Sequence, residues 1–453
     1  MNAQQQIANT VIVGLGKTGL SVARYLASQD RDFSVVDSRE TPPNADDLAR
    51  DYAGVESHYG SFNADWFAEA DQLVVNPGIA IATPEIAKSK AEIVGDIELF
   101  AREVGSTKPI IAITGSNGKT TVTMLLDLMA KKSGVKVGTG GNIGTPALDL
   151  LKENDLELYV LELSSFQLET TTSLQTESAV ILNISEDHLD RYKNDIKLYA
   201  AAKAVIYKNC KHVICNRDDQ LSLELAKEYD VISFGLDAPK DKNYGIEQRD
   251  GEDWLVKGND FILAAGEMKL PGLHNVSNAL AAIALGDVAG LKRSAMIAVL
   301  KEYAGMEHRT QWIAEIDNVD WYNDSKGTNV GATLAALSGL SGKTVLIAGG
   351  QGKGADFLPL KSVIREKARA VVLMGEDASQ IAAFVDQSIP VVFVKSMEEA
   401  VKEAYQLAKQ DDNVLLSPAC ASFDMFKNYA VRGEVFMQEV KNLSVTLEGG
   451  NDA

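Results

Sequence analysis

The stretch "ITGSNGKTT" (Ile113–Thr121) follows the apolar run "KPIIAI" and contains two glycines and a lysine followed by two threonines. Glycine-rich backbone followed by Lys-Thr is typical of phosphate-binding loops, because backbone N–H groups and the lysine surround the anion. In the usual spacing, G-x-x-x-x-G-K-[ST], the first glycine would stand at Ile113, so this loop is a shortened variant. The stretch predicts a phosphate site between a buried strand and a helix.

The residues after this loop have helical periodicity. Val122, Leu125, Leu126 and Met129 recur at i, i+3, i+4 and i+7, and Gly134 is a plausible C-terminal stop. A helix N-terminus presents free N–H groups and the positive end of its dipole to an anion. We therefore expect ATP at this loop, with Lys119 on the β- and γ-phosphates and Thr120 holding magnesium.

A second nucleotide signal lies near the N-terminus, in "VIVGLGKTG". Gly14, Gly16 and Gly19 satisfy G-x-G-x-x-G after an apolar run, and Asp37 ends the next run at about the place of a ribose-binding acid. Alone, this pattern would indicate a dinucleotide-dependent oxidoreductase, or only a tight structural turn. A plain ATPase needs no second site, and a dehydrogenase needs no phosphate loop.

Composition sets broad limits on function. The chain has 453 residues, of which 24% are charged and 45% hydrophobic, and its net charge is −19, which disfavours nucleic acid as a partner. No apolar stretch approaches the roughly 20 residues of a membrane span, and the first residues do not resemble a signal peptide. The chain has three cysteines, Cys210, Cys215 and Cys420, which are too few for a disulfide framework. We therefore expect a cytoplasmic protein.

Short apolar runs alternate with helical patterns, which predicts an α/β fold with parallel sheets. The runs fall into three series, at 9–16, 33–39, 72–78 and 91–96; at 108–115, 158–165, 178–185 and 212–216; and at 343–350, 368–375, 390–396 and 413–419. Between Ser233 and Gly272, Asp-Gly and Gly-Asn turns predict antiparallel hairpins. We predict a Rossmann-like domain (1–98), a central phosphate-loop domain (99–305) and a C-terminal Rossmann-like domain (306–453).

Three polar residues of the central segment are candidates for catalysis. Glu162 ends an apolar strand at the sheet edge where such folds bind ligands, within reach of a metal on Thr120. His188 lies in an acidic loop after another strand. Lys203 shares an apolar helix stripe, where a lysine must snorkel, pair or lose its charge.

Two other patterns indicate structural roles. Cys210, His212 and Cys215 lie in a strand-like run without a second ligand pair, so zinc is disfavoured. Trp312 and Trp321 lie in strand-like runs, and we expect both to be packing residues.

Polar clusters follow three apolar runs of the C-terminal segment, at 323–329, 349–357 and 417–429. Lys326, Lys353, Ser422 and Lys427 together are suited to hold a small anion that carries carboxylates.

These motifs together resemble the Mur ligases, and within that family the members that add D-glutamate. The shortened G-x-x-G-K-T-T loop is shared by those ligases and folylpolyglutamate synthases. Further shared motifs are "GGNIG", "ELSSFQLE", "DHLDRY", "HNVSN", "HR" (308–309), "NDSKGTN" and "SPACASFD". Glu307 departs slightly from the apolar residue expected before His308.

The resemblance implies a role for each site. ATP is expected on Gly115, Ser116, Asn117, Gly118, Lys119, Thr120, Thr121, Asn275, Asn278, Arg309 and Asp324. The UDP part of a nucleotide-sugar substrate is expected on Leu15, Lys17, Thr18, Asp37, Ser38, Arg39, Asn76, Gly78 and Asn142. D-Glutamate is expected on His308, Lys326, Thr328, Lys353, Ser422, Phe423 and Tyr429. Catalysis is expected from Lys119, Glu162, His188 and Lys203, and Mg²⁺ from Thr120, Glu162, His188 and Lys203 as a carbamate.

The implied activity is ATP-dependent addition of D-glutamate to UDP-N-acetylmuramoyl-L-alanine through an acyl phosphate. This would place the enzyme in peptidoglycan precursor synthesis, and so in cell-wall biogenesis, cell shape, cell division and the cell cycle. A monomer is expected, with no nucleic acid or membrane partner. The alternatives are a folylpolyglutamate synthase-like ligase, a dinucleotide-dependent oxidoreductase, and a nucleotide-gated binding protein; binding alone would not require Glu162, His188 and Lys203.

Overall fold

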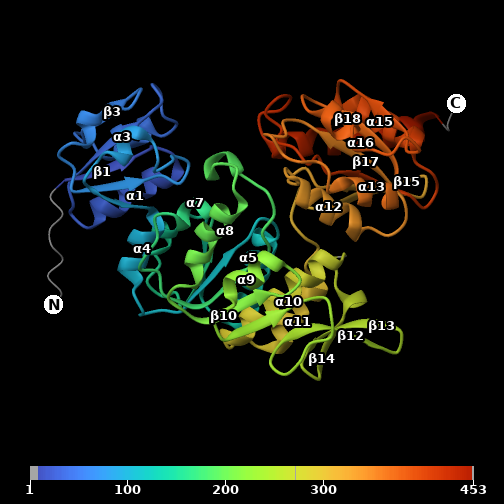
Figure 1. Cartoon of the computed structure of the whole chain (residues 1–453), viewed down its shortest axis with the longest axis horizontal. Coiled ribbons are helices and arrows are strands. Elements are labelled where there is room, and N and C mark those ends of the chain that lie inside the picture. The colour runs from blue at the N-terminus through green and yellow to red at the C-terminus, as the bar shows by residue number, and fades with distance from the viewer. Residues whose placement is uncertain (1–8, 271, 451–453) are drawn as a thin grey trace.

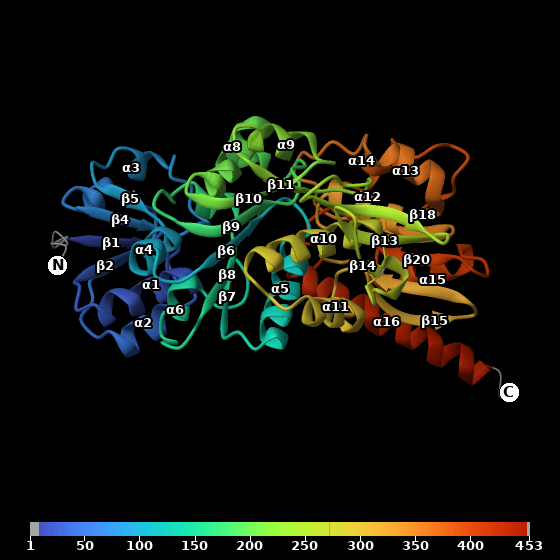
Figure 2. The ribbon, with the colours of Figure 1, turned by 90° about the horizontal axis from the view of Figure 1, so that it is seen from below.

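A computed structural model describes residues 9–270 and 272–450, and within these ranges the strands form sheets of five, nine and six strands. Each sheet belongs to one of three domains. The N-terminal domain (blue) and the C-terminal domain (orange to red) lie at opposite ends, with the central domain between them (Figures 1 and 2). Residues 1–8 and 451–453 of the predicted terminal domains lie outside the described residues. The predicted three-domain α/β fold is confirmed.

The N-terminal domain is a parallel sheet in the order β3-β2-β1-β4-β5. Its strands are β1 (Thr10–Val13), β2 (Phe33–Asp37), β3 (Ser57–Tyr59), β4 (Gln72–Val75) and β5 (Glu92–Val94). Its helices are α1 (Lys17–Ser28), α2 (Ala45–Asp51), the 3₁₀ turn η1 (Ala64–Phe67) and α3 (Pro84–Ala87). β1 and β4 are buried along their whole length, as expected of central parallel strands.

The central sheet has the order β14-β13-β12-β11-β10-β9-β6-β8-β7, parallel from β11 to β7 and antiparallel from β12 to β14. Its strands are β6 (Ile110–Thr114), β7 (Val137–Gly141), β8 (Leu158–Glu162), β9 (Thr176–Ile181), β10 (Cys210–Asn216), β11 (Val231–Phe234), β12 (Tyr244–Arg249), β13 (Glu252–Lys257) and β14 (Asp260–Ala264). Its helices are α4 (Asp96–Val104), α5 (Lys119–Ser133), α6 (Ala147–Leu150), α7 (Ser165–Leu168), α8 (Ile196–Ala204), α9 (Gln220–Ala226), α10 (Leu273–Val288) and α11 (Arg293–Glu302), with 3₁₀ turns η2 (Leu189–Tyr192), η3 (Val205–Tyr207) and η4 (Ala265–Glu267). The predicted hairpins are thus confirmed.

The C-terminal sheet has the order β15-β16-β20-β17-β18-β19, in which only the β15–β16 pair is antiparallel among the described strands. Its strands are β15 (Gln311–Ile316), β16 (Val319–Asn323), β17 (Thr344–Gly349), β18 (Ala368–Met374), β19 (Val391–Phe393) and β20 (Asn413–Leu416). Its helices are α12 (Val330–Gly339), α13 (Leu360–Lys367), α14 (Ala378–Ala382), α15 (Met397–Leu407) and α16 (Tyr429–Gly450). One prediction here is wrong: Trp321 is buried in the core, but Trp312 is 55% exposed and donates to Asp320.

The N-terminal and central domains share one hydrophobic cluster, to which Leu20 and Leu148 both belong, and polar contacts add to it. Arg24 pairs with Asp149 between the N-terminal and central domains, and Arg191 donates to the backbone carbonyls of Pro77 and Ile79 at 3.0 and 3.2 Å. The predicted boundary at 98/99 falls within α4, and that at 305/306 falls in the loop between α11 and β15. In the described residues, no helix has the length and apolar character needed to span a membrane.

Candidate active site

The phosphate-binding loop joins β6 to α5 and is fixed on both sides. Gly118 has φ 81°, the left-handed region, and a Cβ there would lie 2.4 Å from Asn278 Oδ1, so only glycine fits. The Asn117 N–H donates to Asn183 Oδ1 at 2.8 Å, and Asn183 Nδ2 donates back to the Asn117 carbonyl at 3.1 Å. This reciprocal pair ties the loop to the segment after β9. The first turn of α5 is thereby held in place, and its free N–H groups are suited to an anion; anion binding here stays a prediction.

Lys119 starts α5 and turns back over the loop. Its Nζ donates to the carbonyls of Gly115 at 2.7 Å and Ser116 at 2.9 Å. Burial lowers the pKa of this ammonium, while Glu162 and Asp187 oppose that shift. A positive charge held directly over the loop is the arrangement that phosphoryl oxygens require.

Buried oxygen atoms converge beside Lys119. Thr120 Oγ1 donates to Glu162 Oε2 at 2.9 Å, and Asn142 Nδ2 donates to Glu162 Oε1 at 2.8 Å. Arg309, from the loop before β15, donates its Nη2 hydrogen to Thr120 Oγ1 at 2.6 Å, so a cation already lies against these oxygens. A hydroxyl and a carboxylate of this kind are ligands that Mg²⁺ prefers, so the donor set fits that ion.

Lys203, on α8, reaches the same loop from the other side. It is 1% exposed, and its Nζ donates to the Gly115 carbonyl at 3.0 Å and to Thr114 Oγ1 at 3.4 Å. Burial, and then Lys119, lower its pKa well below the ordinary lysine value. Tyr199, one turn earlier, lies under the ammonium with its ring centroid 4.5 Å away. Lys203 is therefore buried on the apolar stripe and does not snorkel to its edge.

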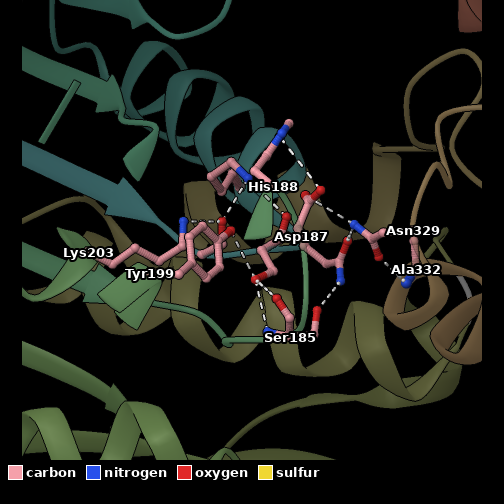
Figure 3. A network of polar contacts seen from close by, with 11 residues as sticks. Ser185, Asp187, His188, Tyr199, Lys203, Asn329 and Ala332 are labelled. Carbon is pink, nitrogen blue, oxygen red and sulfur yellow. Dashed lines mark hydrogen bonds and ion pairs between the residues drawn. The ribbon is translucent and has the colours of Figure 1, made fainter. Parts of the chain in front are cut away.

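His188 follows β9 and is half-exposed, with left-handed backbone at φ 54°. Its Nε2 lies 3.6 Å from Asp187 Oδ1, and its ring packs edge-on against Phe166. Partial desolvation lowers the pKa of the imidazole, and Asp187 opposes the shift. Figure 3 shows His188 and Asp187 in the polar network between Lys203 and Tyr199 on one side and Asn329 on the other.

Among the described residues, no three His, Cys, Asp or Glu side chains gather into a group able to hold a metal. Metal binding at this site would therefore depend on Thr120 and Glu162, on phosphate oxygens, and on any anion created at Lys203. The predicted carbamate stays a prediction.

The predicted D-glutamate residues gather in the C-terminal domain in two groups. Lys326 Nζ lies 3.7 Å from the ring centroid of Tyr429, and the Tyr429 ring is 6.2 Å from that of His308. Lys353 Nζ lies 5.5 Å from the exposed ring of Phe423. Thr328 and the buried Ser422 lie in the two loops that carry these groups, and Lys427 is exposed.

Burial shifts the pKa values of two charged side chains at and beside the first group. Burial, and then Arg309, lower the pKa of Lys326 to about 8. Nearby, burial raises the pKa of Asp324 to about 6, although its carboxylate accepts hydrogen bonds from Ser417 Oγ at 2.6 Å and the Thr310 N–H at 3.0 Å.

The N-terminal glycine turn opens onto a cavity of about 360 Å³ shared with the central domain. Five of the residues predicted to hold UDP line it: Lys17, Thr18, Asn76, Gly78 and Asn142. The others lie at the ends of β1 and β2: the buried Asp37 accepts hydrogen bonds from the Leu15 N–H at 2.7 Å and from Arg39 Nε at 2.8 Å, and Ser38 is exposed. The predicted set is therefore divided between the cavity and the turn above it.

A second cavity, of about 450 Å³, runs from the phosphate loop to α12. Asn117, Gly118 and Asn278 line one side, and Gly331 and Ser338 line the other. Asn275 and Asp324 border an adjoining smaller cavity with Arg309. The predicted ATP residues of the central and C-terminal domains are thus neighbours in space.

Several residues of this site were not predicted from the sequence. Asn183, Ser185 and Tyr199 hold the phosphate loop, Asp187 faces its cations, and Asn329 reaches it from the C-terminal domain. The sequence offered one indication of these residues, namely that they lie close to His188, Lys203 or Thr328 along the chain. Which of them are in contact depends on the tertiary fold.

Three family models match the chain in order. They are the Mur ligase MurD-like N-terminal domain over residues 8–96, the Mur ligase middle domain over 113–286, and the Mur ligase glutamate ligase domain over 308–420. The chain belongs to the Mur ligase family. It is 50% identical over 447 residues to the UDP-N-acetylmuramoylalanine--D-glutamate ligase of Nitrosococcus oceani, covering 97% of this chain and 98% of that protein.

Solved structures of other ligases share the fold. UDP-N-acetylmuramate-alanine ligase MurC of Thermotoga maritima aligns with TM-score 0.60 at 22% identity, covering 96% of this chain and 99% of that one. The bifunctional folylpolyglutamate synthase/dihydrofolate synthase of Yersinia pestis aligns with TM-score 0.58 at 17% identity, covering 76% and 92%. The fold alone therefore does not separate these ligases, and the separation comes from sequence identity.

Proposed function

We propose that this Mur ligase joins D-glutamate to UDP-N-acetylmuramoyl-L-alanine, using ATP and forming an acyl phosphate, in peptidoglycan precursor synthesis in the cytoplasm. The observation that carries the proposal is the contact of Arg309 with Thr120 at 2.6 Å. It brings the basic cluster of the C-terminal domain to the phosphate loop, so an amino acid on one domain faces a phosphoryl donor on the other. The 50% identity to a D-glutamate ligase supports the choice of amino acid.

The chemistry explains why both sites are needed. A carboxylate is a poor acyl donor because its leaving group would be oxide. When its oxygen takes the γ-phosphoryl group of ATP and ADP leaves, the acyl carbon gains phosphate as a leaving group. The amine of D-glutamate then attacks that carbon, phosphate departs, and the amine loses a proton, which leaves an amide.

Each domain has a part in these steps. Lys119 and the N-terminus of α5 stabilise charge on the transferring phosphoryl oxygens, and Arg309 adds a positive charge from the C-terminal domain. Lys326 and Lys353 bind the carboxylates of D-glutamate. The cavity beside Lys17 and Asn142 holds the UDP-sugar, with its acyl end toward Glu162. Closure of the domains excludes water from the acyl phosphate.

Thr120 and Glu162 would hold Mg²⁺, which when bound neutralises phosphoryl charge. The enzyme is proposed to work as a monomer.

The nearest alternative is another amino-acid ligase of the same fold, such as a folylpolyglutamate synthase. The test is phosphate release with Mg·ATP, UDP-N-acetylmuramoyl-L-alanine and one amino acid at a time. Release should require D-glutamate. Equal rates with L-glutamate or a diamino acid would reject the proposed substrate, and release with a folate and L-glutamate instead would support the alternative.

A further inference from the structure

One asparagine joins the C-terminal domain to two loops of the central domain. Asn329 precedes α12, and its Oδ1 accepts a hydrogen bond from the Ala332 N–H at 2.8 Å, which caps that helix. Its Nδ2 lies 3.3 Å from Asn117 Oδ1 in the phosphate loop and 3.3 Å from Asp187 Oδ2 beside His188. Figure 3 shows Asn329 between Asp187 and Ala332, on the side opposite Lys203.

An amide is well suited to this position. Its oxygen accepts and its NH₂ group has two hydrogens, so one side chain makes all three contacts at once. An aspartate would retain the cap but has no donor, and its charge would face Asp187. A serine caps a helix about as well but is too short to reach the other domain. Asn329 is 9% exposed as a whole residue, so water competes weakly for these contacts.

A second residue of the same turn indicates a close fit. A Cβ at Gly331 would lie 2.7 Å from Ser185 Oγ and 3.1 Å from Asn117 Nδ2. The first turn of α12 therefore rests directly on the phosphate loop and on the segment before His188. Alanine favours helix over glycine, so the absence of a side chain here serves the contact rather than the helix.

We propose that Asn329 and Gly331 form a latch that positions the D-glutamate loop over the phosphate loop, with Asn329 as a positioning residue. Lys326 and Thr328 lie immediately before Asn329, so fixing its amide fixes the loop predicted to hold the amino acid. The identity of the amino acid in this inference rests on the proposed function. The contacts of Asn329 and Gly331 are independent of it.

The test compares Asn329→Ser and Gly331→Ala with the wild type. Both variants should keep the melting temperature, since serine still caps α12 and alanine favours it. The value of kcat/KM for D-glutamate should fall at least about 10-fold, because small misplacements of reacting groups cost up to ~10²-fold. Phosphate released per amide formed should rise above the wild-type ratio, since an acyl phosphate left open to water is hydrolysed.

Small-angle X-ray scattering provides a readout independent of turnover. Wild-type enzyme should contract with Mg²⁺ and AMP-PNP, and Asn329→Ser should contract less. Asn63→Ser, another asparagine cap on the exposed turn of η1, and Gly266→Ala, where a Cβ meets open space, are the controls and should match the wild type.

The latch would be overturned if Asn329→Ser contracts as much as the wild type and releases the same amount of phosphate per amide formed. If wild-type enzyme shows no D-glutamate-dependent phosphate release, the proposed function fails while the scattering comparison still decides the latch.

Discussion

At the scale of single residues, Lys119 is the group with the most direct predicted role. Replacing it with alanine should lower turnover by at least about 10²-fold, the usual cost of losing one stabiliser of transition-state charge. The circular dichroism spectrum should stay unchanged, because its two bonds are to carbonyls of a loop that other residues also hold. Near-normal turnover would show that Gly115–Thr121 is not the catalytic phosphate site.

Lys203 is predicted to carry a carbamate. Burial lowers its pKa, so the neutral amine is accessible, and this amine can take up CO₂ with loss of a proton to give an anion near the phosphate loop. Lys203→Ala should be nearly inactive, and acetate should partly restore it, whereas Lys197→Ala, on an exposed position of the same helix, should behave as wild type. Carbon NMR in ¹³CO₂-equilibrated, active enzyme should show a carbamate signal; an unmodified amine there would disprove the modification.

The pH dependence should report Lys326. Its pKa is lowered to about 8 against about 10.4 for a free lysine, so it is cationic below pH 8 and neutral above it. Since the cation binds the carboxylate, kcat/KM for D-glutamate should fall as pH rises through about 8. Lys326→Arg should remove this fall, because a guanidinium stays protonated. The same fall in both enzymes would assign it to another group.

At the scale of elements, helix α5 offers a matched pair of glycines. Gly118 and Gly134 flank it in the left-handed conformation, with φ 81° and 87°. A Cβ at Gly118 would overlap Asn278, whereas one at Gly134 meets nothing within 4 Å. Gly134→Ala should lower the free energy of unfolding by only roughly 1–2 kcal/mol, because alanine is strained in the left-handed conformation. The KM for ATP should stay unchanged. Gly118→Ala should also raise that KM, and equal kinetics in the two variants would contradict this role of the loop.

The strands that the sequence revealed are those with continuous apolar runs. β6, β8 and β17 are buried along their whole length and were predicted, while β7 was not, because "VGTGG" contains three glycines. Gly140 and Gly141 are required there by close contact with the carbonyls of Thr145 and Glu162. β3 and β11 are short or half-exposed and gave weak patterns. Trp312 was misjudged because strand alternation does not say which face is covered.

The site was predictable to the extent that its residues lie in motifs. The phosphate loop, Glu162 and Lys203 were recognised by type and position, and the structure places them within hydrogen-bonding distance of one another or of the same loop. Asn329 and Asp187 were not recognised, because their roles depend on a contact across a domain boundary. Pairings of that kind depend on how the domains dock, which local periodicity does not contain.

At the scale of the whole molecule, two glycine turns at helix N-termini belong to different domains and should act separately. Arg39 pairs with Asp37 at the N-terminal turn and is half-exposed, well placed for a ligand's phosphate or ribose. A hydrogen bond to a charged group contributes about 1.5–3 kcal/mol, so Arg39→Ala should raise the KM for UDP-N-acetylmuramoyl-L-alanine roughly 10-fold or more. The KM for ATP should stay nearly unchanged, because the phosphate loop lies in the central domain. Gly118→Ala should show the reverse pattern. Both constants are measured by phosphate release with the other substrates saturating. Micromolar binding of NAD⁺ to the wild-type enzyme, abolished by Arg39→Ala, would instead make the N-terminal turn a dinucleotide site.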